Sequence, residues 1–123
     1  MDEDLVARIV LFVVMLASGI VLVWMARAAA TGRLKRNSFA GIRIPSTMAS
    51  DEAWLAAHIR AERPTMFAGF VSVASGLFAL VPVPVPVLAI QVLVACVVML
   101  GFVIHGAKVG GRAAKDVSKR SED

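Results

Sequence analysis

Residues that could do chemistry are concentrated in one polar stretch, residues 37–58. Arg43 carries a planar guanidinium, which can hold an anionic group through two parallel hydrogen bonds. Trp54 and His58 are one helical turn apart, so their side chains point the same way. We predict that these three residues face one another across a recognition pocket. In the alternative they belong to a plain connecting loop, with Arg43 at a headgroup phosphate and Trp54 as a membrane anchor.

Enzymatic activity is not predicted from this sequence. The chain has no Ser/His/Asp set, no glycine loop suited to phosphates and no cysteine–histidine spacing typical of metal ligands. A metal bound by His58 and His105 would need one or two further ligands. The single cysteine, Cys96, is expected to be a small packing residue. We therefore expect no catalytic residue, no metal and no cofactor.

Most of the remaining chain is hydrophobic. Of 123 residues, 59% are hydrophobic, against roughly 45–50% in soluble domains. Residues 64–107 carry no charge, and as one helix they would be more than twice as long as a bilayer is thick. The alternating prolines at 82–86 must break that helix, because proline lacks an amide donor and disfavours helix in the residue before it. The predicted fold is a single all-α membrane domain, residues 1–123, with spans at about 6–28, 65–81 and 87–106, a loop at 29–63 and a flexible tail at 108–123.

Lysine and arginine set the predicted orientation. The segment before the first span holds one of these residues, the middle loop with its flanks seven, the proline hairpin none and the tail five. Because basic residues stay in the cytoplasm, we expect the loop and the tail inside and the N-terminus and the hairpin outside. The same bias, with contact to anionic headgroups, explains the net charge of +4, so no nucleic-acid partner is expected. A cleaved signal peptide fits less well, because the N-terminus is acidic and the apolar run is long.

The loop is expected to contain a short helix that lies along the inner membrane surface. Ser50 is a suitable N-cap, and the two acidic residues after it favour the positive end of a helix dipole. Trp54 and its apolar neighbours would form the side of this helix that faces the membrane. Pro64 is expected to begin the next helix, which is the second span.

Small residues in the second span predict close helix packing. The candidates for this packing are Ala68, Gly69, Ser72, Ser75 and Gly76. Those at 68, 72 and 76 recur every four residues and therefore stack on one face. That face could contact the first span, the third span or a second protomer. Gln91 in the third span is expected to hydrogen-bond to a neighbouring helix.

The polar stretch resembles the signature of a known family. From Asn37 the chain reads Asn-x-x-x-Gly-Ile-Arg-x-Pro-x-Thr, and a Trp-x-x-x-His helix follows. This pattern looks like the signature loop of the SdpI family of bacterial membrane proteins, whose founding type gives immunity to a secreted antimicrobial peptide. The resemblance implies a core of one span, the loop and two further spans. The signature falls on Asn37, Gly41, Ile42, Arg43, Pro45, Thr47, Ser50, Trp54 and His58.

Two functions from different classes are consistent with these features. The first is immunity to, or sensing of, a membrane-active peptide, and its partner would be a peptide toxin. The second is a structural accessory subunit, bound to a larger membrane complex through the small-residue face. Both place the chain in the bacterial inner membrane, in contact with the lipid bilayer and its anionic headgroups. This chain has only the family core, whereas immunity members often carry additional spans.

Overall fold

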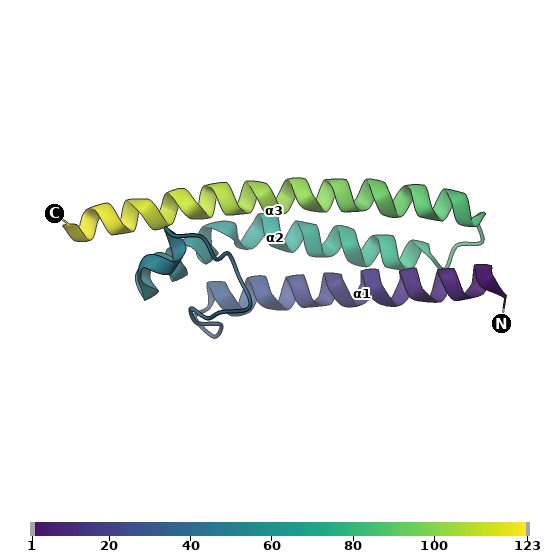
Figure 1. Ribbon diagram of the computed structural model, residues 1–123, viewed down its shortest axis with the longest axis horizontal. Helices are drawn as coiled ribbons and strands as arrows, with labels where there is room; N and C mark the ends of the chain where they lie inside the picture. The colour runs from purple at the N-terminus through teal and green to yellow at the C-terminus, as the bar shows by residue number, and fades with distance from the viewer. Residues whose placement is uncertain (1, 123) are drawn as a thin grey trace.

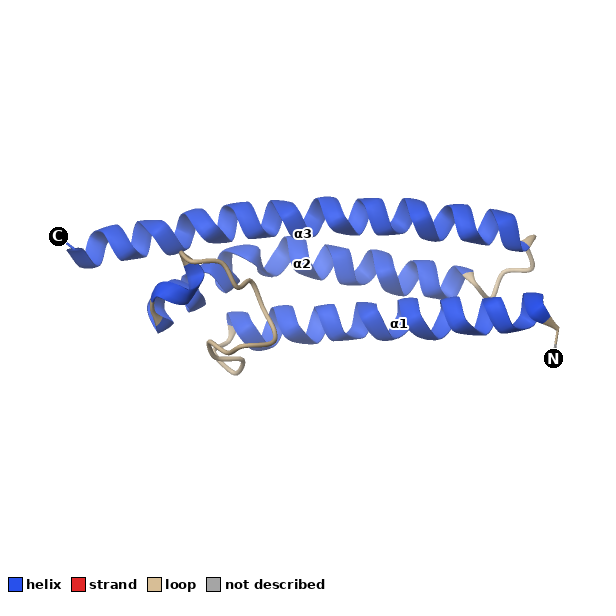
Figure 2. Cartoon of the chain, viewed as in Figure 1, coloured by secondary structure: helices blue, strands red, loops and turns tan. Residues whose placement is uncertain are grey.

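The computed structural model describes residues 2–122 and contains three long helices (Figure 1, Figure 2). The elements are α1 (Glu3–Ala30), a short 3-10 helix η1 (Thr47–Ala49), α2 (Asp51–Phe78) and α3 (Val85–Glu122). No strand occurs among the described residues, so the predicted all-α class is confirmed. Two helices, α1 and α3, are long and apolar enough to cross a membrane.

The three long helices form a flat layer with α2 in the middle (Figure 1). Helices α1 and α3 run in the same direction and α2 runs against them, so both neighbours of α2 are antiparallel to it. Contact between α1 and α3 is slight. The large apolar side chains of α1 and α3 are mostly exposed, whereas alanines dominate the buried apolar residues. This distribution is the one expected where lipid, rather than water, surrounds the helices.

Helices α1 and α2 pack through small residues. A Cβ added to Gly69 would lie 2.9 Å from the carbonyl oxygen of Gly19, and one added to Gly76 would lie 2.9 Å from the amide nitrogen of Leu16. Between these glycines, the hydroxyl of Ser72 donates to the carbonyl of Met15 at 2.7 Å. The sequence left three partners open for the small-residue face, and the structure places its residues 69, 72 and 76 against α1. Ala68 is fully buried.

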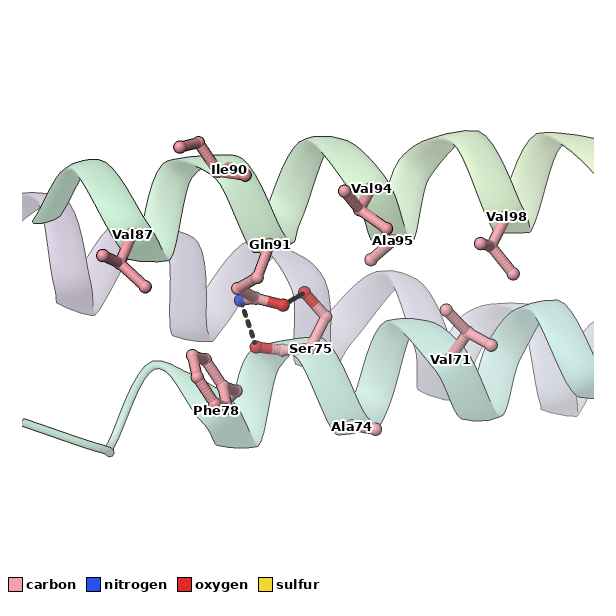
Figure 3. A pocket seen from close by; sticks show the side chains of 10 residues that line it. All are labelled: Val71, Ala74, Ser75, Phe78, Val87, Ile90, Gln91, Val94, Ala95 and Val98. Atoms are coloured by element: carbon pink, nitrogen blue, oxygen red, sulfur yellow. Dashed lines mark hydrogen bonds between the residues drawn. The ribbon is translucent and has the colours of Figure 1, made fainter. Parts of the chain in front are cut away.

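Helices α2 and α3 are joined inside the span by a pair of polar side chains (Figure 3). The hydroxyl of Ser75 donates to Gln91 Oε1 at 3.0 Å, and Gln91 Nε2 donates to the backbone carbonyl of Ser75 at 3.1 Å. The expected hydrogen bond from Gln91 to a neighbouring helix is therefore confirmed. Ser75 thus belongs to the interface with α3, unlike Gly69, Ser72 and Gly76 of α2, which contact α1.

The prediction of a separate interfacial helix was wrong. Pro64 lies inside α2, which runs without interruption from the loop into the apolar segment. The proline ring lies against α3, where a Cβ added to Gly106 would be 3.5 Å from Pro64 Cβ. Residues 51–63 therefore extend α2 and pack along α3 through Ala53 and Ala57, which form a buried cluster with Ala114.

The C-terminal segment also differs from the prediction. Residues 108–122 were expected to be a flexible tail, but they continue α3 as a helix as far as Glu122. Small residues explain the difference, because Gly110 and Ala114 let this segment pack on the N-terminal half of α2. A Cβ added to Gly110 would lie 2.8 Å from the carbonyl oxygen of Ala57. The two helices thus extend together beyond the apolar segments.

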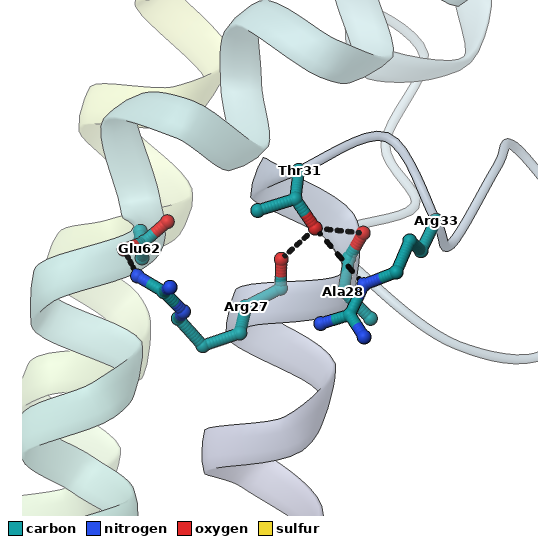
Figure 4. Close-up of polar contacts among 5 residues, drawn as sticks. All are labelled: Arg27, Ala28, Thr31, Arg33 and Glu62. Carbon is teal, nitrogen blue, oxygen red and sulfur yellow. Dashed lines mark hydrogen bonds and ion pairs between the residues drawn. The ribbon is translucent and has the colours of Figure 1, made fainter.

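Polar contacts tie the helices at both ends of the layer. At one end, the guanidinium of Arg8 donates to the carbonyls of Val81 and Val83 in the proline hairpin. At the other end, Arg27 forms an ion pair with Glu62 at 3.3 Å (Figure 4). The hydroxyl of Thr31 closes α1 there by donating to the carbonyl of Arg27 at 2.7 Å.

Candidate functional site

The segment between α1 and α2 folds into a defined structure that begins with a turn built by Asn37. The side-chain oxygen of Asn37 accepts from the amides of Phe39 and Ala40, both at 2.8 Å. Its Nδ2 donates to the carbonyl of Lys35 at 2.7 Å and to that of Ala40 at 3.2 Å. An asparagine that bonds to the backbone on both sides in this way fixes a turn without a neighbouring strand or helix.

Gly41 lets the chain pass directly over the aromatic side chains of α2. Its φ of +104° lies in the region that glycine adopts without strain. A Cβ at this position would lie 2.6 Å from the ring of Trp54 and 2.9 Å from His58 Nε2. The amide of the next residue, Ile42, donates to His58 Nε2 at 2.9 Å. The loop is thus held to α2 by one histidine and one backbone amide.

Trp54 is buried beneath the loop and does not face the membrane. Its side chain is 3% exposed, and its ring centroid lies 4.2 Å from that of His58. The indole N–H donates to the carbonyl of Leu34 at 2.9 Å. The predicted anchoring of Trp54 in the headgroup region was wrong, because the loop supplies both a hydrogen-bond acceptor and a cover for the indole ring.

Thr47 and Ser50 shape the end of the loop. Thr47 is fully buried, and its hydroxyl is 2.6 Å from the carbonyl of Ile42 while it accepts from the amide of Ile44 at 3.1 Å. Pro45 lies exposed in the turn that these bonds close. The predicted N-cap is confirmed, because the hydroxyl of Ser50 accepts from the amide of Ala53 at 3.0 Å.

Arg43 does not join the other two residues of the predicted pocket. It is exposed, and its Nε donates to the carbonyl of Asn37 at 3.0 Å. This bond ties the Arg43 side chain to the turn built by Asn37, and Arg43 makes no hydrogen bond to Trp54 or His58 among the described residues. The predicted grouping of Arg43 with Trp54 and His58 was therefore wrong, and the residues that meet this pair are Gly41 and Ile42.

Two contacts of the loop were not predicted from the sequence. One is the carbonyl of Leu34, a backbone acceptor whose residue type says nothing of its role. The other is Arg36, whose Nη1 donates to the carbonyl of Met48 at 2.7 Å and whose Nε lies 3.3 Å from Asp51. The basic residue and the acidic first turn of α2 are complementary, and this complementarity could have indicated the second contact.

The hydrogen bonds fix the protonation state of His58. Nε2 receives the amide proton of Ile42 and so carries no proton, while Nδ1 lies 2.8 Å from the carbonyl of Trp54 and donates to it. Burial disfavours the imidazolium and lowers the pKa of His58 below its usual value, although the hydrogen bond to Trp54 opposes this shift. A neutral imidazole therefore connects the loop to α2.

Acidification is expected to weaken this connection. When the loop is released, His58 recovers its ordinary pKa near 6.5. It then binds a proton at a pH at which the folded form still holds the imidazole neutral. Stability is then full above that pH and falls as the pH drops through the lowered pKa, by at most about 1.4 kcal/mol per pH unit.

Unfolding in detergent at pH 7.5 and 5.5 measures how steeply the free energy of unfolding changes with pH. His58→Gln, which cannot titrate, should flatten it, and His105→Gln should keep it; a slope unchanged in His58→Gln contradicts the assignment.

A small cavity of about 90 Å³ lies beside His58, between the three long helices and the loop. Apolar side chains of α1 form one wall of it, and Gly41 and Ile42 form another. Within residues 2–122, no three His, Cys, Asp or Glu side chains are grouped closely enough to hold a metal ion. The arrangement around His58 thus holds the loop in place against α2.

The fold and the loop together define a class of small helical membrane domain, in which a polar loop is closed over a buried Trp–His pair. A sequence model of the SdpI/YfhL protein family matches residues 33–105, a range that contains the signature residues, all of α2 and the first part of α3. The chain belongs to the SdpI/YfhL family. No curated protein and no solved structure shows significant similarity to it.

Proposed function

We propose that the protein crosses the bacterial inner membrane three times, with the loop and the C-terminus in the cytoplasm, and protects the cell against a membrane-active peptide. Family membership and the apolar helices α1 and α3 support the membrane location. The direction of the helices supports three crossings. Since α1 and α3 run the same way, a chain that crosses with both must return between them, and α2 is the only element available (Figure 1).

The lower apolar content of α2 is compatible with a crossing. Two of its faces are covered by α1 and α3, so fewer of its side chains meet lipid. Its charged residues Glu62 and Arg63 lie just before the apolar segment, where the basic residues of the loop and of α3 also gather. This distribution supports the cytoplasmic placement of that end.

Labelling of introduced cysteines tests the topology. In a chain whose Cys96 is replaced, a cysteine at Val83 should react with a membrane-impermeant reagent in intact cells. A cysteine at Ser38 should react only after permeabilisation, because the seven basic residues around it stay inside. Labelling of position 38 in intact cells would overturn the orientation.

The observation that carries the protective role is the family match over residues 33–105, which includes the signature loop, because the founding type of that family confers peptide immunity. A deletion strain should be more sensitive to membrane-active peptides, and the wild-type chain should restore resistance. Arg43→Ala should restore it less well, because Arg43 is the exposed cation within the signature and its removal leaves the Trp–His contacts intact. Arg33→Ala serves as a control for lost charge. Unchanged sensitivity of the deletion strain to every peptide class would contradict the role.

The accessory-subunit function has less support. Its proposed contact surface was the small-residue face, and Gly69, Ser72 and Gly76 of that face are occupied by α1. A partner would have to use another surface, such as the apolar groove between α2 and α3 (Figure 3). The polar groups of Ser75 and Gln91 in that groove already bond to each other. Stoichiometric recovery of a large complex in mild detergent would favour this function over protection.

A further inference from the structure

A basic groove lies where the end of the signature loop crosses α3. Its volume is about 630 Å³, and its walls come from loop residues 44–46 and from α3 residues 104–115. Gly111 permits the crossing, because a Cβ there would lie 3.1 Å from the side chain of Ile44 and 3.7 Å from the hydroxyl of Ser46. The groove is distinct from the cavity beside His58.

Three cations line this groove without a counter-charge. Lys108, Arg112 and Lys115 follow one another at helical spacing on one face of α3, and no acidic residue is part of the wall. The ion pairs found within residues 2–122 join Arg27 to Glu62 and Arg36 to Asp51, so none of them neutralises the groove. Like charges at this spacing repel each other, and a bound anion would relieve the repulsion.

Ser46 supplies a hydrogen-bond donor without a partner. Its hydroxyl oxygen is buried and makes no hydrogen bond to any described residue. Leaving a buried polar group unpaired is unfavourable, so such groups in native proteins usually have a partner. Ser46 belongs to the loop wall of the groove and the three cations belong to its α3 wall, so an anionic oxygen that reaches the hydroxyl is its complementary partner.

The position of the groove along α3 points to a lipid rather than a soluble anion. One end is at Ile104, which is 45% exposed and belongs to the apolar part of the helix. The basic residues begin one turn further on, at Lys108. The groove therefore passes from the apolar zone into the charged zone over roughly 16 Å. An anionic phospholipid has a matching sequence of groups, because its apolar acyl chains are followed by a charged phosphate.

We propose that this groove binds the phosphate of an anionic phospholipid, with Lys108, Arg112 and Lys115 as its charge partners and the Ser46 hydroxyl as a donor. The inference rests on the proposed topology, which places this end of α3 at the inner leaflet. Basic pockets on the cytoplasmic side of helical membrane proteins are known to take anionic headgroups.

Native mass spectrometry of the purified full chain, titrated in detergent with phosphatidylglycerol or phosphatidylcholine, tests the proposal. The wild type should prefer phosphatidylglycerol. Lys108→Gln with Lys115→Gln should weaken that binding roughly 25-fold, about fivefold for each lysine. The matched control, Lys35→Gln with Lys119→Gln, removes the same charge outside the groove and should bind as the wild type does. Arg112 stays unchanged because it also lines a neighbouring groove.

Ser46→Ala separates a specific contact from general attraction. It should weaken phosphatidylglycerol binding roughly tenfold without any change of charge. Equal losses in the groove pair and the control pair would overturn the proposal, as would unchanged binding by Ser46→Ala. Equally tight binding of soluble glycerol phosphate would overturn the choice of a lipid. Labelling at position 38 in the groove variant reports the topology separately, so a failure of lipid binding leaves the orientation and the protective role standing.

Discussion

Replacement of Gly41 by alanine is expected to lower the free energy of unfolding by about 2–5 kcal/mol. Two effects add at this position. The backbone has a φ of +104°, which an L side chain rarely adopts. The new Cβ would also lie 2.6 Å from the ring of Trp54, so either the indole or the loop must move. Because Gly41 precedes the amide that bonds to His58, this movement should break the bond and release the loop.

Gly32 provides a matched control within the same loop. Its φ is +81°, but a Cβ added there would meet nothing within 4 Å. Gly32→Ala should therefore cost only the backbone strain, about 1–2 kcal/mol. Unfolding of both variants by denaturant in the same detergent gives the comparison. Equal losses in the two variants would show that contact with the aromatic pair contributes nothing.

Trp54→Ala is the second change with a large expected effect. Removal of a buried aromatic side chain typically costs about 3–5 kcal/mol, because the cavity that it leaves closes only in part. At this site the cavity would lie between the loop and α2, and His58 would lose its ring neighbour. The expected result is a protein that keeps its helices by circular dichroism but whose loop is cut readily by protease.

Two further tryptophan variants separate packing from hydrogen bonding and from lipid contact. Trp54→Phe keeps an aromatic ring and loses the bond to the carbonyl of Leu34, so it should cost about 1–2 kcal/mol. Trp24 is 55% exposed on α1, and Trp24→Ala should change stability much less than Trp54→Ala. If the two alanine variants proved equally stable, the burial of Trp54 would have no energetic consequence.

The helices could be predicted from the sequence because their causes are local. Uncharged segments, the proline hairpin and the Ser50 cap each act within a few residues, and α1, the start of the helix at Asp51 and the start of α3 lie close to where these signals placed them. Pro64 misled the prediction, because the helix that begins at Asp51 continues through it, and packing of residues 51–63 on distant parts of α3 supports that continuation. The helix at residues 108–122 was not predicted for a similar reason. It is stabilised by packing on α2, which is distant in the sequence.

The site was predicted in its residues but not in its contacts. The spacing of the signature identified Gly41, Trp54 and His58. The contact between the rings of Trp54 and His58 follows from helical geometry alone. The partners of these rings are backbone groups, the amide of Ile42 and the carbonyl of Leu34, which exist at every residue and leave no trace in the sequence. Arg43 stood out by its charge, yet its bond goes to the turn that carries it.

The slight contact between α1 and α3 has a consequence for how the protein is made. The ribosome delivers α1 first and the less apolar α2 second, and α2 is the helix that touches both others. A helix of that composition enters lipid poorly by itself, so it gains from a partner that is already in the membrane. Gly19 of α1 and Gly69 and Gly76 of α2 let these two helices pack closely, and the short hairpin brings α3 to the opposite side of α2 soon afterwards. With the three crossings proposed above, we expect each new helix to be added to the one made just before it.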